Sequence, residues 1–241
     1  PEMRATELAW LDHIRAVFES YGFVNIETPA VEEIDVLLSK GETDKEIYTL
    51  HRLQADENDK SDARLALHFD LTVPFARYTA QHFNELSFPF KRYQMQKVWR
   101  GERPQEGRFR EFYQCDIDII NPDHLPMHFD AEVPAIIDQI MQGFDVPAYT
   151  ISINNRKILI GFMQALGLEE QAGAVLRILD KHDKIGLEGV KKQLADTLHL
   201  APAVIDQATR IIQIRGTDTS VIDKARSLHV SNALFEEGLN E

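Results

Sequence analysis

Residues 90–120 read FKRYQMQKVWRGERPQEGRFREFYQCDIDII, and the interpretation of the whole chain starts from them. Apolar and aromatic residues alternate with polar ones on both sides of a segment that contains glycine and proline. This pattern predicts two strands, residues 90–100 and 110–120, joined by a loop. Arginines stand at both ends of that loop, so the region is expected to be a polar hairpin with concentrated positive charge.

One face of the predicted hairpin collects groups that suit a nucleotide. Side chains two residues apart share a face of a strand, which groups Arg100 with Glu102. The same rule groups, on the second strand, Phe112, Gln114, Asp116 and Asp118. Guanidinium groups offer planar, permanently charged donors to phosphate. We therefore expect a surface that fits a polyanionic nucleotide beside a small zwitterion.

The charge distribution supports a local anion site. The whole chain of 241 residues carries a net charge of −13, which argues against a general nucleic-acid-binding surface. Residues 90–110 hold seven Lys or Arg against two Glu, a balance of +5, so the rest carries −18. The alternative is a solvated hairpin with surface ion pairs, each contributing only about 0–1 kcal/mol. Charge pattern alone leaves both interpretations open.

Elements on both sides of the hairpin indicate a mixed α/β region. Apolar residues at helical spacing predict helices over residues 4–21 and 130–143, and Gly22 is suited to end the first. A further helix is expected from the turn at Asp70 to about His82, with Pro74 in its first turn. Strands are predicted over residues 23–29, 65–69 and 149–153. Residues 54–62 are expected to form an exposed loop.

After residue 155 the pattern becomes helical in several short segments, and Pro202 suits a first helical turn. We therefore predict a mixed domain over residues 1–155 and an all-helical domain over residues 156–241. No apolar run approaches 18 residues, and the chain starts without a signal-like segment. The single Cys115 excludes an internal disulfide and is interpreted as a small apolar strand residue. The nine histidines show no metal-ligand spacing, so no metal site is expected, and the location is expected to be cytoplasmic.

Arg-x-Glu followed by a loop and Gly-Arg-Phe-Arg-Glu-Phe-Tyr-Gln resembles motif 2 of class II aminoacyl-tRNA synthetases, in the wording of the histidyl-tRNA synthetases. Two other segments agree in order: residues 4–29 resemble motif 1, the dimer-forming segment, and residues 69–78 (FDLTVPFARY) resemble the histidine-binding segment. Residues 179–185 (LDKHDKI) and those that follow resemble the family's helical insertion domain, which helps to hold the tRNA acceptor stem. The resemblance spans essentially the whole chain. It implies an α+β fold, a class II synthetase-type antiparallel sheet flanked by helices with a small all-helical insertion domain.

The same resemblance implies ATP-dependent activation of histidine and its transfer to histidine tRNA, by a homodimer. Arg100 is implied to contact the ATP α-phosphate and the histidine carboxylate, as the catalytic cation. Glu102 is implied to lie near the adenine and Phe112 to stack on it. Arg108 is implied to reach the β- and γ-phosphates. Mg²⁺ is expected with ATP as substrate, without a dedicated metal cage.

For histidine, the resemblance implies that Asp70 and Thr72 take the α-ammonium group. Gln114 is implied to fix the amino-acid backbone, and Asp118 to accept a hydrogen bond from the imidazole. Simpler roles stay open: Asp70 and Thr72 as helix caps, Asp118 as partner of a strand neighbour such as Lys97, and Phe112 as core.

Two segments of the family pattern are not found in these 241 residues: an Arg-Gly-Leu-Asp-Tyr-Tyr type segment and motif 3, each with an ATP-site arginine. The anticodon-binding domain is not recognised either. The chain is therefore interpreted as a truncated synthetase, and these residues alone are expected to support little histidine-dependent ATP–pyrophosphate exchange. The alternative is a non-catalytic, histidine-sensing regulatory subunit of ATP phosphoribosyltransferase. The intact Arg-x-Glu loop and Asp-Leu-Thr segment favour the enzyme.

Overall fold

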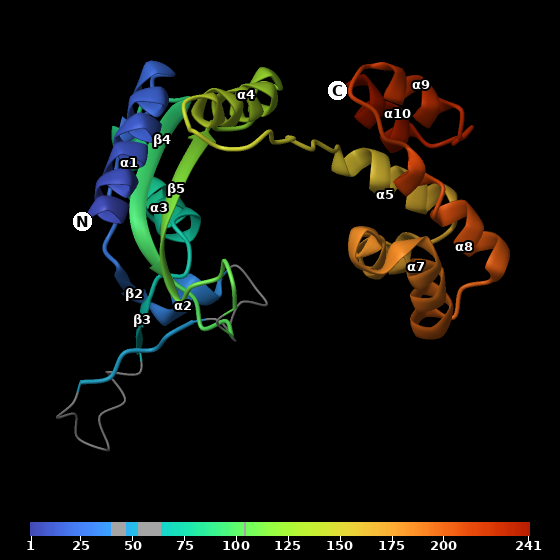
Figure 1. Ribbon diagram of the computed structural model, residues 1–241, viewed down its shortest axis with the longest axis horizontal. Coiled ribbons are helices and arrows are strands. Elements are labelled where there is room, and N and C mark those ends of the chain that lie inside the picture. Colours follow the sequence, from blue (N-terminus) through green and yellow to red (C-terminus); the bar gives the residue numbers. More distant parts are fainter. Residues whose placement is uncertain (40–46, 53–63, 104) are drawn as a thin grey trace. The chain divides into compact units, whose positions relative to one another are not determined.

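The computed structural model describes residues 1–39, 47–52, 64–103 and 105–241. It divides into two compact units, Pro1–Ile151 and Ser152–Glu241 (Figure 1). The expected loop over residues 54–62 lies outside the described residues. The mixed and the helical regions thus form separate bodies, each described here by itself.

The first unit is built on the long hairpin expected from the sequence. Strands β4 (Phe90–Trp99) and β5 (Glu111–Ile120) pair antiparallel along their whole length. The short β1 (Val24–Asn25) pairs parallel with β4, so the sheet has the order β1-β4-β5 and is mixed. β2 (Val31–Glu33) and β3 (Leu65–Leu67) form a second, antiparallel pair. The helix-flanked sheet is confirmed, with one parallel strand that the pattern did not predict.

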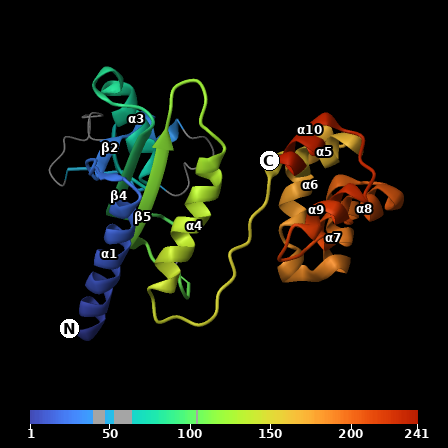
Figure 2. The ribbon, with the colours of Figure 1, turned by 90° about the horizontal axis from the view of Figure 1, so that it is seen from above.

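Two helices cover the apolar face of this sheet. α1 (Glu2–Ser20) and α4 (His128–Gln142) share a core cluster with the strands, and its buried members are Val17, Phe18, Phe23, Tyr93, Ile136 and Ile140. Figure 2 shows both helices beside the two long strands. Cys115 packs against this cluster, as expected for a small apolar strand residue. The opposite, polar face of the strands is thereby left for the candidate site.

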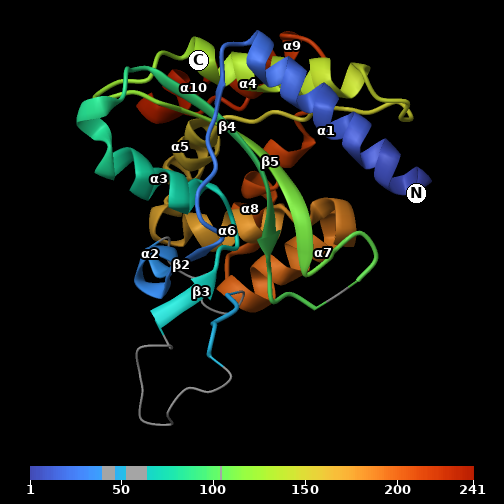
Figure 3. The same cartoon turned by 90° about the vertical axis from the view of Figure 1, so that its left-hand side faces the viewer.

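α3 (Thr72–Gln81) lies beside β4 (Figure 3), and Pro74 is in its first turn, as expected. The ring of Phe75 is 5.9 Å from that of Phe90 at the start of β4. The other elements among the described residues of this unit are α2 (Ile34–Leu38) and a 3₁₀ turn, Phe83–Glu85. The beginning of α3 is therefore held close to the polar face of the long hairpin.

Two of the predicted strands are wrong in extent or kind. Residues 149–153 form no strand, because their backbone pairs with no neighbouring strand in the described part of the chain; Tyr149 instead donates from its hydroxyl to Asp138, at 2.8 Å. The strand predicted over residues 23–29 shrinks to β1, since only two of its residues pair with β4. Alternating sequence patterns predict extended backbone, but a strand also needs a partner.

The second unit is all helical, as expected. Its helices are α5 (Arg156–Ala165), α6 (Ala172–Leu179), α7 (His182–Leu198), α8 (Pro202–Ala208), α9 (Ser220–Arg226) and α10 (Ala233–Asn240), with 3₁₀ turns at Glu169–Gln171 and Ile211–Gln213. Pro202 opens α8 at a position where a missing N–H costs nothing. The core of this second unit includes Met163, Val175 and Leu194, all fully buried. None of the helices among the described residues is long and apolar enough to cross a membrane.

Gly161 is the point where α5 meets α10, and its replacement by alanine is expected to destabilise this unit. A Cβ at Gly161 would lie 2.4 Å from the backbone nitrogen of Phe235 and 2.7 Å from Oδ1 of Asn232, which caps α10. Overpacking of this kind costs about 1–3 kcal/mol, more than the helix-propensity gain of about 1 kcal/mol. Urea unfolding measures the change. Gly173→Ala on α6, where a Cβ meets nothing within 4 Å, is the control and should be neutral or slightly stabilising.

Candidate active site

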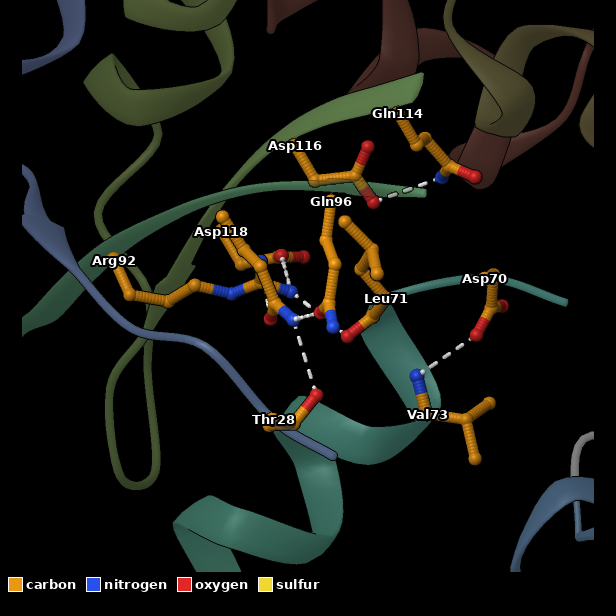
Figure 4. Close-up of polar contacts among 10 residues, drawn as sticks. Thr28, Asp70, Leu71, Val73, Arg92, Gln96, Gln114, Asp116 and Asp118 are labelled. Carbon is orange, nitrogen blue, oxygen red and sulfur yellow. Dashed lines mark hydrogen bonds and ion pairs between the residues drawn. The ribbon is translucent and has the colours of Figure 1, made fainter. Parts of the chain in front are cut away.

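The polar face of β4 and β5 carries a row of side chains that face one another across the two strands. The register places Arg92 opposite Asp118, Gln94 opposite Asp116 and Gln96 opposite Gln114. Figure 4 shows Arg92, Gln96, Gln114, Asp116 and Asp118 beside the start of α3. Alternation along each strand puts them on the face away from the α1–α4 core. The site is thus a consequence of the strand period together with an unbroken antiparallel register.

Arg100 lies just beyond the end of β4 and is fixed by three contacts. Its Nε donates to the backbone oxygen of Phe69 at 3.0 Å, and its Nη2 donates to Oε1 of Gln114 at 3.3 Å. Its guanidinium carbon lies 5.2 Å from the centre of the Phe112 ring. The structure therefore brings together three of the residues proposed from the sequence, namely Arg100, Phe112 and Gln114.

Glu102 and Arg108 lie in the loop between the strands and contact each other. Nη1 of Arg108 is 2.8 Å from Oε2 of Glu102, and the Arg108 side chain is 60% exposed. The expectation that Arg100 and Glu102 share the face of a strand is wrong, because β4 ends at Trp99 and the chain turns into the loop. The loop returns through a turn at Gly107, whose φ of +75° is in the left-handed region that glycine tolerates.

Asp70 is buried, with 2% of its surface exposed, and it caps α3. Its Oδ1 accepts a hydrogen bond from the backbone N–H of Val73 at 3.2 Å. The capping role left open from the sequence is therefore present for Asp70. Thr72 is the first residue of α3 and its side chain is exposed, so the two members of this pair occupy different environments.

Asp118 pairs with Arg92, and not with Lys97 as the sequence analysis considered. Its Oδ2 is 2.5 Å from Nη2 of Arg92, which is completely buried. Lys97 instead pairs with Glu111 at 2.5 Å. Lys97 and Asp118 have opposite parity in the antiparallel register, so their side chains lie on different faces of the sheet.

Carboxyl groups accumulate around Arg92 on the polar face. Burial lowers the pKa of Arg92, whereas Asp118, Asp116 and Asp70 raise it. Burial also raises the pKa of Asp116; Asp118 and Asp70 raise it further, and Gln114 and Arg92 lower it. Nε2 of Gln114 donates to Asp116 at 2.9 Å. The polar face around Arg92 is therefore a connected polar network that contains more carboxyl groups than cations.

Three residues of this face, Arg92, Gln94 and Gln96, have no role predicted from the sequence, and Asp116 was placed on the face without an individual role. Gln94 is completely buried and donates from Nε2 to Thr28 at 3.0 Å and to Gln96 at 2.6 Å. The strand period was a usable signal for these residues, since they alternate with the core residues Tyr93 and Met95. Among the described residues, no group of three or more His, Cys, Asp or Glu is arranged to hold a metal ion.

Cys115 is expected to react slowly with thiol reagents in the folded protein. Burial raises its pKa to about 11, and Asp116 adds to this effect. Only the thiolate reacts, so the rate at pH 8 should be about 100-fold lower than for an ordinary thiol. Measurement of the rate with a chromogenic disulfide, before and after unfolding in guanidinium, checks this. Equal rates in the two states would contradict the partial burial of Cys115.

Comparisons with known proteins agree over the full chain. The family model described as "Histidyl-tRNA synthetase" matches residues 1–240. A histidine–tRNA ligase from Thermobifida fusca is 59% identical over 100% of this chain and 55% of its own length, and one from Micrococcus luteus is 47% identical with the same coverage. The chain thus spans about half the length of the curated relatives it matches.

Solved structures give the same fold. A crystal structure of histidyl-tRNA synthetase from Nostoc sp. PCC 7120 superposes with a TM-score of 0.85 at 40% identity, covering 98% of this chain and 52% of that one. A structure from Bacillus halodurans C, described as an ATP phosphoribosyltransferase regulatory subunit/histidyl-tRNA synthetase, has a TM-score of 0.81 at 21% identity. At that identity the second likeness supports the fold alone.

Proposed function

Because the chain belongs to the histidyl-tRNA synthetase family, we propose that it forms part of an enzyme that activates histidine with ATP and transfers it to histidine tRNA. The observation that carries this proposal is the fixed position of Arg100, between the Phe69 carbonyl, Gln114 and the Phe112 ring. A guanidinium held in this way meets developing charge without reorganising. The substrates are L-histidine, ATP with Mg²⁺, and tRNA.

Arg100 serves the first chemical step. The carboxylate of histidine attacks the α-phosphorus of ATP, a bond to the bridging oxygen breaks, and pyrophosphate leaves. Negative charge on the α-phosphate oxygens rises in the transition state, and the Arg100 guanidinium stabilises it. The two hydrogen bonds that orient Arg100 use Nε and one N–H of Nη2, so the N–H groups of Nη1 and the second N–H of Nη2 can donate to substrate.

The remaining nucleotide contacts come from the loop and β5. Phe112 offers a ring face for the adenine, and Glu102 lies near that base. Arg108 reaches the β- and γ-phosphates after its ion pair with Glu102 opens, at a small energetic cost because Arg108 is mostly exposed. Mg²⁺ enters as part of the ATP substrate, coordinated by phosphate oxygens.

Histidine is recognised at the polar face next to the start of α3. Asp70 and Thr72 bind the α-ammonium group, Gln114 fixes the amino-acid backbone, and Asp118 accepts a hydrogen bond from an imidazole N–H. The surplus of carboxyl groups around Arg92 supports this assignment, since it favours a ligand with positive charge. Asp70 both caps α3 and binds substrate in this scheme, through different lone pairs.

The macromolecular partners follow the family pattern. The helical region, residues 156–241, acts as the insertion domain that holds the tRNA acceptor stem. The segment of α1 and β1 forms a homodimer interface, which the exposed apolar side chains of Met3, Leu8, Trp10 and Val24 support. The protein works in the cytoplasm. A monomeric mass in solution would contradict the dimer.

Histidine-dependent exchange of pyrophosphate into ATP tests the function. The protein that contains this chain should catalyse it and then charge histidine tRNA in a second assay. Other amino acids should give no exchange. If the protein shows no exchange but activates an ATP phosphoribosyltransferase catalytic subunit when histidine is varied, the regulatory-subunit alternative is correct instead.

A further inference from the structure

We propose that Arg92 is a positioning residue that sets the distance between the two ends of the histidine pocket. This proposal rests on the proposed function, because it assumes that Asp70, Thr72 and Asp118 bind histidine. Arg92 does not itself touch the substrate. Arg92 links the segment that receives the α-ammonium group to the carboxylate that receives the imidazole.

The contacts of Arg92 run in both directions from one guanidinium. Nη2 donates to the backbone oxygen of Leu71 at 3.0 Å and is 2.5 Å from Oδ2 of Asp118. Leu71 stands directly between Asp70 and Thr72 and is completely buried. Figure 4 shows Arg92 reaching from β4 toward both partners. A single nitrogen atom thus joins the start of α3 to β5.

The guanidinium is itself immobilised. Arg92 is completely buried, and its guanidinium carbon lies 4.3 Å from the centre of the Phe75 ring in α3. Its Nη1 is 3.4 Å from Oε1 of Gln94, a long contact that adds orientation more than strength. Burial, the contact with the Phe75 ring and the hydrogen bond to Leu71 together restrict the position of the side chain. Because the cation is held in place, its ion pair fixes the orientation of the Asp118 carboxylate, whose side chain is 23% exposed.

The carboxyl groups around Arg92 explain why the fold needs a cation at this position. Asp70, Asp116 and Asp118 all act on Arg92. Without Arg92 these three carboxyl groups would repel one another in a partly buried space. The ion pair with Arg92 orients the Asp118 carboxylate so that it can accept from an imidazole N–H. Three carboxyl groups around this one cation leave a net negative charge that attracts the α-ammonium group.

The geometry also accounts for arginine in preference to lysine. Arginine presents several donors in one rigid plane, whereas lysine presents a single ammonium on a flexible stem. Only the planar fork contacts Leu71, Gln94 and Asp118 while stacking on Phe75. Lysine would preserve the charge but not the spacing. The conservative Arg92→Lys change therefore separates positioning from electrostatics.

The test compares Michaelis constants for the two small substrates in the complete protein. Arg92→Lys and Arg92→Gln should each raise KM for histidine about tenfold or more in pyrophosphate exchange, as expected for loss of a charge-assisted contact. KM for ATP should change less than twofold. Lys91→Gln is the matched control. Lys91 precedes Arg92 in β4 but lies on the other face of the sheet, where it pairs with Glu132 of α4 at 2.8 Å, so its replacement should leave both constants unchanged.

A double-mutant cycle shows whether Arg92 acts through Asp118. Asp118→Asn alone should raise KM for histidine, and adding Arg92→Lys to it should cause little further increase. Additive effects, equal increases in both Michaelis constants, or failure of both Arg92 variants to fold would overturn the proposal. If the unmodified protein shows no histidine-dependent exchange, the proposed function fails instead, so the two failures are distinguishable.

Discussion

Replacing Arg100 by alanine is expected to lower kcat/KM for histidine-dependent pyrophosphate exchange by about 100–1,000-fold in the complete protein, the usual loss for one fixed transition-state donor. The variant removes a guanidinium that is held by the Phe69 carbonyl and Gln114. Because these contacts lie at the surface of the polar face and not in the core, the thermal unfolding temperature should change by only a few degrees. Exchange kinetics measure kcat/KM, and a melting curve on the same sample measures the unfolding temperature.

Arg177→Ala is the control for this experiment. Arg177 is an exposed arginine on α6 in the second unit, and its loss should leave exchange unchanged because that assay contains no tRNA. A near-normal exchange rate in Arg100→Ala would mean that the catalytic cation has been misplaced. Loss of activity together with unfolding would point to a structural role for Arg100 instead.

Asp70→Ser is expected to raise KM for histidine about 10- to 100-fold with little loss of stability. Serine is as good an N-cap as aspartate, so its hydroxyl can still accept from the Val73 N–H. It lacks the negative charge that the α-ammonium group needs, and a hydrogen bond to a charged group contributes about 1.5–3 kcal/mol. Histidine titrations in the exchange assay give KM, and thermal unfolding gives stability.

Asp70→Ala completes this comparison. It removes both the charge and the cap, so it should show the same rise in KM and, in addition, a loss of about 1 kcal/mol of stability. If Asp70→Ser binds histidine as well as the unmodified protein, Asp70 is only a cap. The pair of variants therefore resolves two roles that the sequence leaves open.

The central hairpin was predictable because both its strands and its loop are encoded locally. Apolar and polar residues alternate over the middle of both strands around a Gly/Pro segment, which predicts a hairpin, and the structure confirms it within one residue at the ends next to the loop. Helices α1 and α4 were also predictable, because the helical spacing of their apolar residues is a local feature of the sequence. Residues 149–153 and β1 were not, because pairing depends on distant backbone that no local pattern reveals.

The candidate site was predictable in outline only. The resemblance to the histidyl-tRNA synthetases is confirmed by the family match, and the grouping of Arg100, Phe112 and Gln114 follows from the hairpin. Arg92 was counted among the seven basic residues of a predicted local anion site, whereas it is completely buried and surrounded by carboxyl groups. Sequence composition cannot distinguish an arginine in solvent from one enclosed by carboxyl groups, because burial depends on the placement of α3.

The pairing of α5 with α10 brings the two ends of the second unit to the same place. Nδ2 of Asn155, which precedes α5, donates to Oε2 of Glu241, which follows α10, at 2.8 Å. A polypeptide whose entry and exit points coincide can be opened elsewhere and rejoined here by a short linker. Because residues 155 and 241 are adjacent, a circular permutant of residues 152–241 that joins them through a short linker is expected to retain the fold of this unit.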